Sequence, residues 1–153
     1  MIYDYKRALD RLDYIYSSLS KAPIDEYVVA LLAAHICVIQ SGILENIVKE
    51  IMGAYVEKRS SVEVTNYVKI RLRDLQNPRT DRIEEVIGAF SSEWRSKLSK
   101  FWEESEIKEH INSIVANRNQ ISHGRTTSVT ISQTKDWIKS IRIFAEFAEK
   151  TFT

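Results

Sequence analysis

The stretch DEYVVALLAAHICVI, residues 25–39, decides the fold, because a helix with this sequence is apolar around almost its whole circumference. Asp25 is a typical N-cap residue, and we expect one long helix from there to about Lys58, at the centre of a bundle. The apolar run Tyr27–Ile39 has thirteen residues, whereas a helix that spans a bilayer needs about 20. The stretch therefore predicts a buried core helix and no membrane association.

The composition of the whole chain also favours helices. The 153 residues are 44% apolar and 28% charged, which is enough for one core and one domain over residues 1–153. Four Gly and two Pro are too few for the frequent turns of a β-sandwich or barrel, or for a Gly-rich phosphate-binding fold. We therefore expect an all-α bundle of about five to seven helices.

Apolar residues at spacings of three and four predict helices on both sides of the central one. The expected ranges are 3–20, 25–58, 60–77, 81–89, 91–104, 105–123 and 133–151. Residues 126–131 are β-branched and polar, and form either a loop or one short strand. Gly42 and Gly53 lie inside the central helix, where close packing or a local bend would explain them.

Charge and cysteine content narrow the class of protein. Lys and Arg total 22 against 21 Asp and Glu, so no global field attracts nucleic acid or a membrane surface. The single cysteine, Cys37, permits no internal disulfide, and residues 1–7 lack the apolar run of a signal peptide. No His, Cys or carboxylate groups have zinc-site spacing. These features predict a cytoplasmic protein without a metal or other cofactor.

The segment NRNQISHGR, residues 117–125, carries the candidate chemistry. Helical steps from the apolar positions 107, 111, 114 and 115 lead to Arg118, and a charge there must be paired or face a partner. Asn119 and His123 are four apart and share an adjacent face. Arg118 and His123 are about 140° apart on a regular helix, so they converge only if the helix ends or turns at His123. Gly124 suits such an end as the C′ residue.

An Arg, a polar amide and a His are the minimum set for cutting RNA without a metal. When the ribose 2′-OH attacks the adjacent phosphorus, a His can move a proton and an Arg can stabilise the phosphate oxygens. The structural alternative is that Arg118 and His123 only complement the dipole at a helix C-terminus, with Asn119 as a cap residue.

Arg118-Asn119 followed by three residues and His123 resembles the R-x4-6-H motif of the HEPN superfamily of small all-α domains. The length, the helical make-up and the position of the motif before a final helix agree with this resemblance. Residues 42–59, with Glu45 and Lys49 one turn apart, resemble the second helix of bacterial HEPN branches, including the branch found beside RNA-repair genes.

The resemblance implies a metal-independent endoribonuclease that dimerises and joins two motifs in one composite active site. By position, Arg118 would stabilise the transition state, His123 would do acid–base work and Asn119 would assist. Supporting or RNA-binding roles are expected for Glu45, Lys49, Ser122 and Arg125. The resemblance also implies RNA as substrate, and a toxin–antitoxin, anti-phage or RNA-surveillance role with an antitoxin or other defence-system protein as partner. Tyrosine-modified toxins carry a Tyr where this chain has Arg125, so that control is not expected.

A different class of function is also open: a non-catalytic helical module that binds RNA, a nucleotide or a protein through the same surface. Basic residues gather in two groups that would permit a phosphate-binding groove in a near-neutral protein. They are Arg71, Arg73, Arg79 and Arg82 in one group, and Arg118, Arg125, Lys135, Lys139 and Arg142 in the other.

Overall fold

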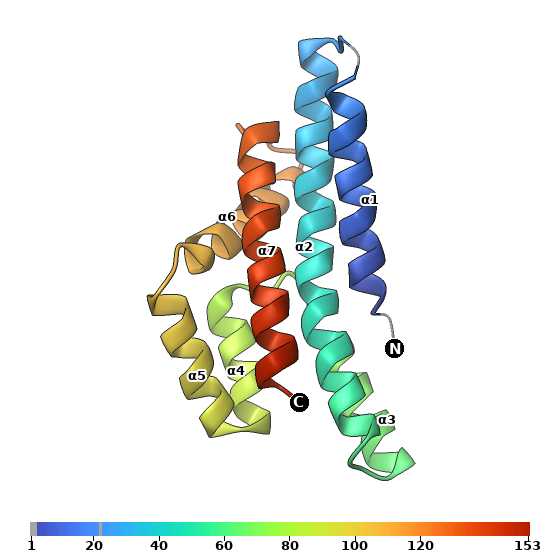
Figure 1. The fold of residues 1–153 in the computed structure, drawn as a ribbon, viewed down its shortest axis with the longest axis vertical. Helices are drawn as coiled ribbons and strands as arrows, with labels where there is room; N and C mark the ends of the chain where they lie inside the picture. Colours follow the sequence, from blue (N-terminus) through green and yellow to red (C-terminus); the bar gives the residue numbers. More distant parts are fainter. Residues whose placement is uncertain (1–2, 22) are drawn as a thin grey trace.

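The computed structural model describes residues 3–21 and 23–153, and within them the chain forms seven α-helices and no strand (Figure 1). The helices are α1 Asp4–Leu19, α2 Glu26–Glu57, α3 Val62–Arg73, α4 Thr80–Phe90, α5 Ser92–Glu103, α6 Ile107–Ser122 and α7 Ile131–Thr151. The predicted all-α bundle of five to seven helices is confirmed. Residues 124–130 form a loop, so the alternative of a short strand near residue 126 is wrong.

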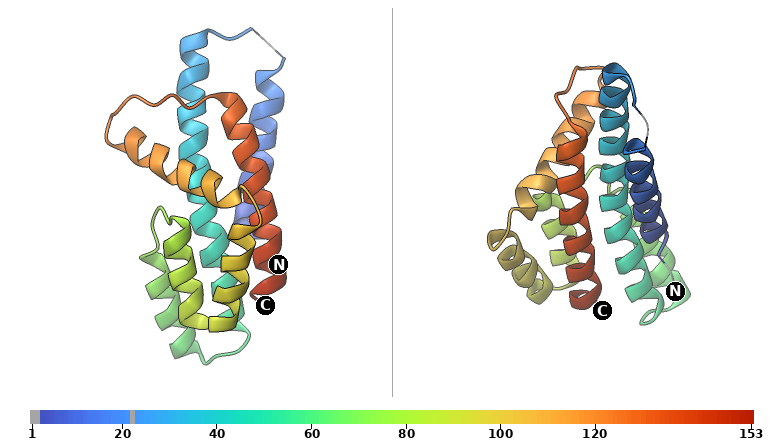
Figure 2. Two further views of the ribbon diagram at one scale, coloured as in Figure 1. Left: turned by 90° about the vertical axis from the view of Figure 1, so that its left-hand side faces the viewer. Right: turned by 45° about the horizontal axis from the view of Figure 1, so that its top comes forward.

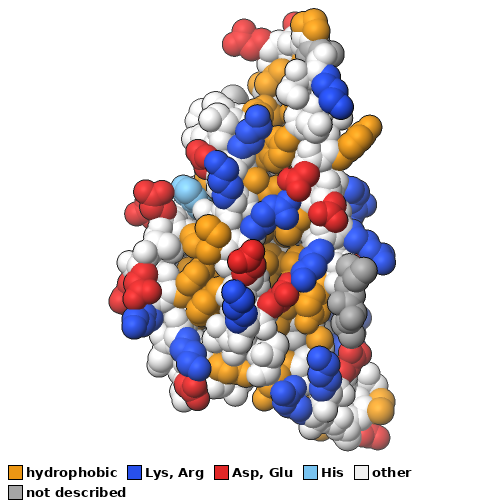
Figure 3. Space-filling view, in the orientation of Figure 1, with side chains coloured by type: hydrophobic (Ala, Val, Ile, Leu, Met, Phe, Trp, Pro, Cys, Tyr) orange, Lys and Arg blue, Asp and Glu red, His pale blue; other side chains and the backbone are white. Residues whose placement is uncertain are grey.

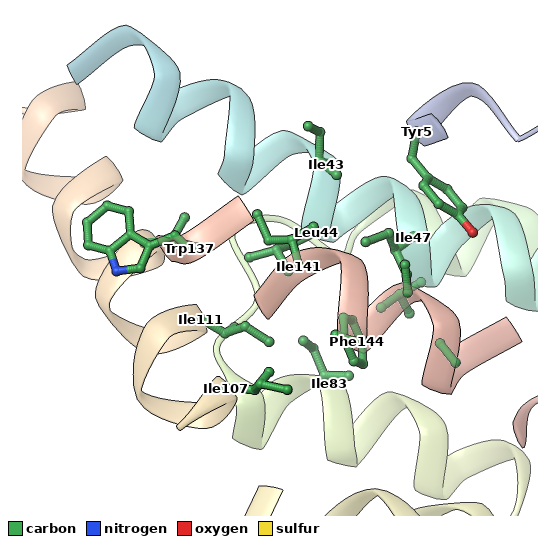
Figure 4. Close-up of a cluster of buried hydrophobic side chains, with 14 of the residues drawn as sticks. Tyr5, Ile43, Leu44, Ile47, Ile83, Ile107, Ile111, Trp137, Ile141 and Phe144 are labelled. Atoms are coloured by element: carbon green, nitrogen blue, oxygen red, sulfur yellow. The ribbon is translucent and has the colours of Figure 1, made fainter. Parts of the chain in front are cut away.

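Helix α2 is the central helix, as predicted. It contacts α1, α3, α6 and α7 (Figure 1). The carboxylate of Asp25 accepts a hydrogen bond from the backbone N–H of Tyr27 at 2.9 Å, which confirms this N-cap. Figure 4 shows the core that surrounds α2, with Ile83 of α4, Ile111 of α6 and Phe144 of α7 converging on Leu44. The core therefore joins helices from both halves of the sequence.

The expectation that the first half of α2 is buried on all sides is wrong. Tyr27 is 72% exposed, Leu31 54% and Val28 43%, although Ala33 and Ile36 on the opposite side are buried. Helix α3 packs against the carboxyl-terminal half of α2, where Thr65 bonds the carbonyl of Val56, and leaves the amino-terminal half open. We call the apolar residues Ile24, Tyr27, Val28 and Leu31 the α2 face.

By length and composition alone, α2 could cross a membrane, since a window within it has a mean hydropathy of 2.0. The core helix of a globular protein meets the same criterion. Fourteen of its residues are buried against the rest of the bundle, from Ala33 to Val56. From Ala33 onward, the packing agrees with the predicted core helix.

The loop between α3 and α4 fixes the lower part of the bundle to α2 and α6. Asn77 adopts a left-handed backbone conformation with φ 46°, and its side chain accepts a hydrogen bond from the Ser41 hydroxyl at 3.2 Å. The backbone N–H of Thr80 donates to the side chain of Asn112 at 3.0 Å. These contacts connect α2, the α3–α4 segment and α6, and Figure 2 shows from the side how α6 crosses α2.

Candidate active site

The first half of α6 anchors the segment that carries the candidate chemistry. Ile107, Ile111, Ile114 and Val115 are buried, with exposed fractions of 5% or less. The Cys37 thiol of α2 lies 3.5 Å from the backbone carbonyl oxygen of Ile114. Because Asn112 connects to the loop near Ser41 and Ile114 lies at Cys37, α6 runs toward the amino-terminal half of α2. The end of α6 therefore lies at the level of the open part of α2 (Figure 2).

Gly124 ends α6 in the way that the sequence predicts. Its φ is +69°, the left-handed region that favours glycine. The Gly124 N–H donates to the carbonyl of Ile121 at 3.1 Å, and the Arg125 N–H donates to the carbonyl of Gln120 at 3.0 Å. These two bonds form a complete Schellman motif. The motif fixes the backbone on both sides of His123.

The helix end does not turn His123 toward Arg118, however. His123 is the C-cap residue with φ −90° and ψ 12°, and its N–H still bonds the carbonyl of Asn119 at 3.2 Å. It therefore continues the helical path, about 140° around the axis and about 7.5 Å along it from Arg118. The change of direction comes one residue later, at Gly124. Within one chain, Arg118 and His123 lie on different faces of α6.

The side chains at the end of α6 are open to solvent. Arg118 is half-buried, and Asn119, Ser122, His123 and Arg125 are exposed. Among the described residues, neither Arg118 nor His123 has a side-chain hydrogen bond or an ion pair. The Ser122 hydroxyl donates to the carbonyl of Arg118 at 2.7 Å, and Arg125 donates to the Gln120 side chain at 3.3 Å. The Arg118 guanidinium and the His123 imidazole are thus both free to bind a ligand.

The sequence around the motif adds no negative charge. Residues 117–130 contain two Arg and one His, and no Asp or Glu. By contrast, charges of both signs alternate on the face of the molecule seen in Figure 3. A segment free of carboxylates at a helix end can bind phosphate without competition from its own side chains.

Glu45 and Lys49 lie in a different environment. Glu45 accepts a hydrogen bond from the backbone N–H of Asn77 at 2.6 Å and lies 3.4 Å from the Lys49 ammonium group. The same loop reaches α6 at Asn112, eleven residues before His123 and about 16 Å from it along the helix. The pair is mostly shielded from solvent and holds the α3–α4 loop to α2. The structure does not bring it to Arg118 and His123 of the same chain.

Most of the other basic residues near the motif already have partners. Lys139 pairs with Asp136 and Arg142 with Asp13. The Lys135 ammonium group lies 5.8 Å from the centre of the Tyr16 ring. In the group near α4, Arg82 pairs with Glu85. Within the predicted second basic group, the cations without an ion pair among the described residues are Arg118, Arg125 and Lys135.

A metal site is not visible in the part of the chain that the structure describes. No group of three or more His, Cys, Asp or Glu side chains lies close enough to hold an ion there.

Sequence reasoning missed the open α2 face beside this end of α6. The signal that could have found it is the helical spacing of Ile24, Tyr27, Val28 and Leu31, a stripe at intervals of three and four. In a helix that is apolar all round, that stripe looks no different from the buried side. Only the packing shows which side is left uncovered.

The seven helices and the motif at the end of α6 define a HEPN-type domain. The family model for RiboL-PSP-HEPN matches residues 3–153, and the chain belongs to this family. The resemblance to HEPN domains is thus confirmed over nearly the whole chain, while the association with RNA-repair genes stays a prediction. Neither the comparison with curated proteins nor that with solved structures gave a match.

Proposed function

We propose that this protein is a metal-independent endoribonuclease that acts as a homodimer. The observation that carries the proposal is the end of α6, where Arg118 and His123 have no partner among the described residues and no carboxylate is nearby in sequence. A HEPN-type domain is often a ribonuclease, and this chain retains the motif residues. The cytoplasm is the compartment in which we expect it to act.

The proposed reaction is an internal transesterification. The 2′-oxygen of a ribose forms a bond to the adjacent phosphorus, and the bond from phosphorus to the 5′-oxygen breaks. One His123 accepts the proton of the 2′-OH, and a protonated His123 donates a proton to the leaving 5′-oxygen. Arg118 binds the phosphate oxygens as negative charge develops, and Asn119 orients the imidazole or the substrate. The products are a 2′,3′-cyclic phosphate and a 5′-hydroxyl.

The geometry of one chain favours a site built from two. Arg118 and His123 of a single chain are on different faces of α6, and one imidazole cannot begin the reaction as both base and acid. A second copy would supply the other His123 and bring its Arg118 from the opposite side. The end of α6 lies at the level of the amino-terminal half of α2, whose open face a second copy would cover.

Gly42 supports this arrangement. It lies on the same side of α2 as Tyr27 and Leu31, and a Cβ added there would meet nothing within 4 Å. Close packing inside one chain therefore does not explain this glycine. A backbone that must approach a second copy does explain it.

Ser122 and Arg125 are proposed to bind the RNA on either side of the cleavage point, since both are exposed next to His123. Glu45 and Lys49 are proposed to support the site indirectly through the α3–α4 loop. A role in toxin–antitoxin, anti-phage or RNA-surveillance systems, with a neutralising or defence-system protein as partner, follows from the HEPN resemblance.

The cleavage assay uses end-labelled RNA in the presence of EDTA. We expect cleavage with 2′,3′-cyclic phosphate ends, and loss of at least about a hundredfold in rate for both His123→Ala and Arg118→Ala. Arg11→Ala removes an exposed arginine from α1 and is the matched control, with unchanged rate. A requirement for Mg²⁺, or activity that survives both substitutions, would contradict the mechanism.

The same variants separate the enzyme from a binding module. If the protein cuts no RNA and Arg118→Ala only weakens RNA binding, the motif serves recognition and the protein is not an enzyme. If cleavage appears only after a bound partner protein is removed, the protein is an enzyme that its partner neutralises.

The dimer has its own test. Leu31 is 54% exposed, so Leu31→Glu should fold, yet a charge on the α2 face should break the dimer and stop cleavage together. Val62→Glu places the same charge on α3, where Val62 is 71% exposed, and should change neither. Analytical ultracentrifugation measures the mass. A wild-type monomer that cleaves at full rate would exclude the composite site.

A further inference from the structure

A second surface, separate from the end of α6, consists of a groove between α3 and α4. Its volume is about 660 Å³. The two helices stand apart because each packs mainly on another helix: α3 on α2, and α4 on α5 (Figure 2). Its walls are mostly apolar, with Val68, Leu72 and Leu75 on the α3 side and Val86, Ala89 and Phe90 on α4.

Helix α3 presents more apolar surface than its own packing uses. Only Thr65 and Leu72 of its twelve residues are buried. Val64, Tyr67, Val68 and Arg71 follow spacings of three and four and lie on one side, of which Tyr67, Val68 and Arg71 line the groove. Tyr67 is 58% exposed and Val64 50% exposed. A stripe with this spacing is the pattern that one helix presents to another.

One charge on this stripe is fixed in place and unpaired. The Arg71 Nε donates to the Tyr67 hydroxyl at 3.2 Å, and the guanidinium lies 5.2 Å from the centre of the Tyr67 ring. Arg71 has no ion pair among the described residues, while Arg82 on the opposite wall is already paired with Glu85. Asp74 also lines the groove but forms no ion pair with Arg71, so the groove combines an apolar floor with one oriented cation that is not ion-paired among the described residues.

We propose that this groove binds an amphipathic helix of a partner protein, whose apolar stripe fills the groove and whose Asp or Glu pairs with Arg71. A second copy of the chain fits less well, because a two-fold contact centred on Arg71 would place Arg71 against Arg71. RNA also fits less well, because five of the six apolar wall residues are aliphatic, and the Arg71 guanidinium already lies over one face of the Tyr67 ring. The inference concerns a surface apart from Arg118 and His123, and it does not depend on RNA cleavage.

A displayed library of helical peptides tests this proposal on the full chain. The library varies the residues around a helix. Peptides that bind the wild-type protein are selected, and peptides that also bind Ala89→Glu are removed. Ala89 is exposed within the groove, so its substitution should leave the fold intact while it fills the groove and repels an acidic helix. We expect enriched peptides with apolar residues at i, i+3, i+4 and i+7 and an acidic residue beside them.

Affinities of the enriched peptides then locate the contact. Ala89→Glu should weaken binding about tenfold or more, whereas Val62→Glu, on α3 outside the groove, should leave it unchanged. Arg71→Gln should weaken binding of the acidic peptide, and should have little further effect once the peptide's own Glu is replaced by Gln.

Three outcomes would overturn the proposal. The first is a selection that enriches no peptide sensitive to Ala89→Glu. The second is single-stranded RNA whose binding is lost in Ala89→Glu, which would make the groove an RNA subsite. The third is wild-type self-association that Ala89→Glu abolishes, which would assign the groove to a second copy. RNA cleavage, measured on the same Ala89→Glu protein, is a separate readout that reports on the proposed active site alone.

Discussion

The two halves of α6 differ in how far their side chains are buried. In the first half, Ile107, Ile111 and Ile114 are buried against the rest of the bundle, whereas in the second half Asn119 and His123 are exposed and without side-chain partners among the described residues. Helix α2 shows the opposite order, since its carboxyl-terminal half is packed and its amino-terminal half is open. Because the open halves of α2 and α6 lie at the same level of the bundle, the proposed binding surface and the packed core occupy separate ends of the same two helices.

The largest expected effect is a loss of stability in the packed half of α6. Ile114→Ala should lower the free energy of unfolding by about 2–5 kcal/mol, because it leaves a cavity at a side chain with 0% exposure. Asn119→Ala, in the open half, should change it by less than about 0.5 kcal/mol. Urea unfolding of both variants checks the contrast. Equal losses would show that the two halves of α6 do not differ in this way.

Alkaline pH should weaken the same packed half. Burial raises the pKa of the Cys37 thiol from its ordinary value of 9.0 to about 11. The folded state thus favours the neutral thiol, and this stability is complete below pH 9.0 and is lost as the pH rises to about 11, by about 2–3 kcal/mol. Unfolding experiments across this range should show a smaller decrease for Cys37→Ala. An identical decrease in both proteins would contradict the burial of an uncharged thiol.

Gly124→Ala tests the turn that ends the open half. A Cβ at φ +69° is strained, so we expect a loss of about 1 kcal/mol in stability and a slower cleavage rate, since the backbone around His123 loses its fixed geometry. Gly124→Asn should cost less, because Asn tolerates the left-handed conformation better. Thermal unfolding and the RNA assay measure both. Full stability and activity in the alanine variant would show that the Schellman motif is dispensable.

The smallest expected effect comes from the glycines of α2. Gly53→Ala should stabilise the chain by about 0.5–1 kcal/mol, since its new Cβ would meet only the Lys69 side chain at 3.6 Å. Gly42→Ala should give the same gain in the monomer but weaken the dimer, because it would obstruct a second copy. Sedimentation at several concentrations checks this difference. If the Gly42→Ala dimer has the same affinity as the wild type, the interface does not include this part of α2.

Much of the fold can be predicted from local sequence signals. Asp25 begins α2 and Gly124 ends α6 because each acts on backbone groups within a few residues. The start of α7 lies two residues before the predicted one, at Ile131, because Thr130 and Gln133 form a capping box inside a segment that its β-branched residues suggested was a loop or strand. Helix caps can be predicted from the sequence because they depend on neighbouring residues. At residues 126–131, however, the β-branched composition favoured a loop or strand over the start of a helix.

The environment of the site is less predictable. Glu45 and Lys49 look like an exposed pair in sequence, but the α3–α4 loop, some thirty residues away, folds over Glu45 and binds it through Asn77. The α2 face and the groove beside Arg71 also depend on tertiary packing. They are open because the neighbouring helices pack against other sides of α2, α3 and α4. These features arise from contacts between distant segments, so neither periodicity nor the spacing of a motif reveals them.

Mixed dimers test the central claim, that the active site joins motifs from two chains, most directly. Wild-type protein is mixed with an excess of inactive His123→Ala protein, allowed to exchange subunits and assayed on RNA in EDTA. The composite site predicts that the rate per wild-type chain falls as mixed dimers form, because a mixed dimer holds a single intact His123, which cannot serve as both base and acid. If subunits exchange and the rate per wild-type chain is unchanged, each chain carries a complete site of its own, and the account is wrong.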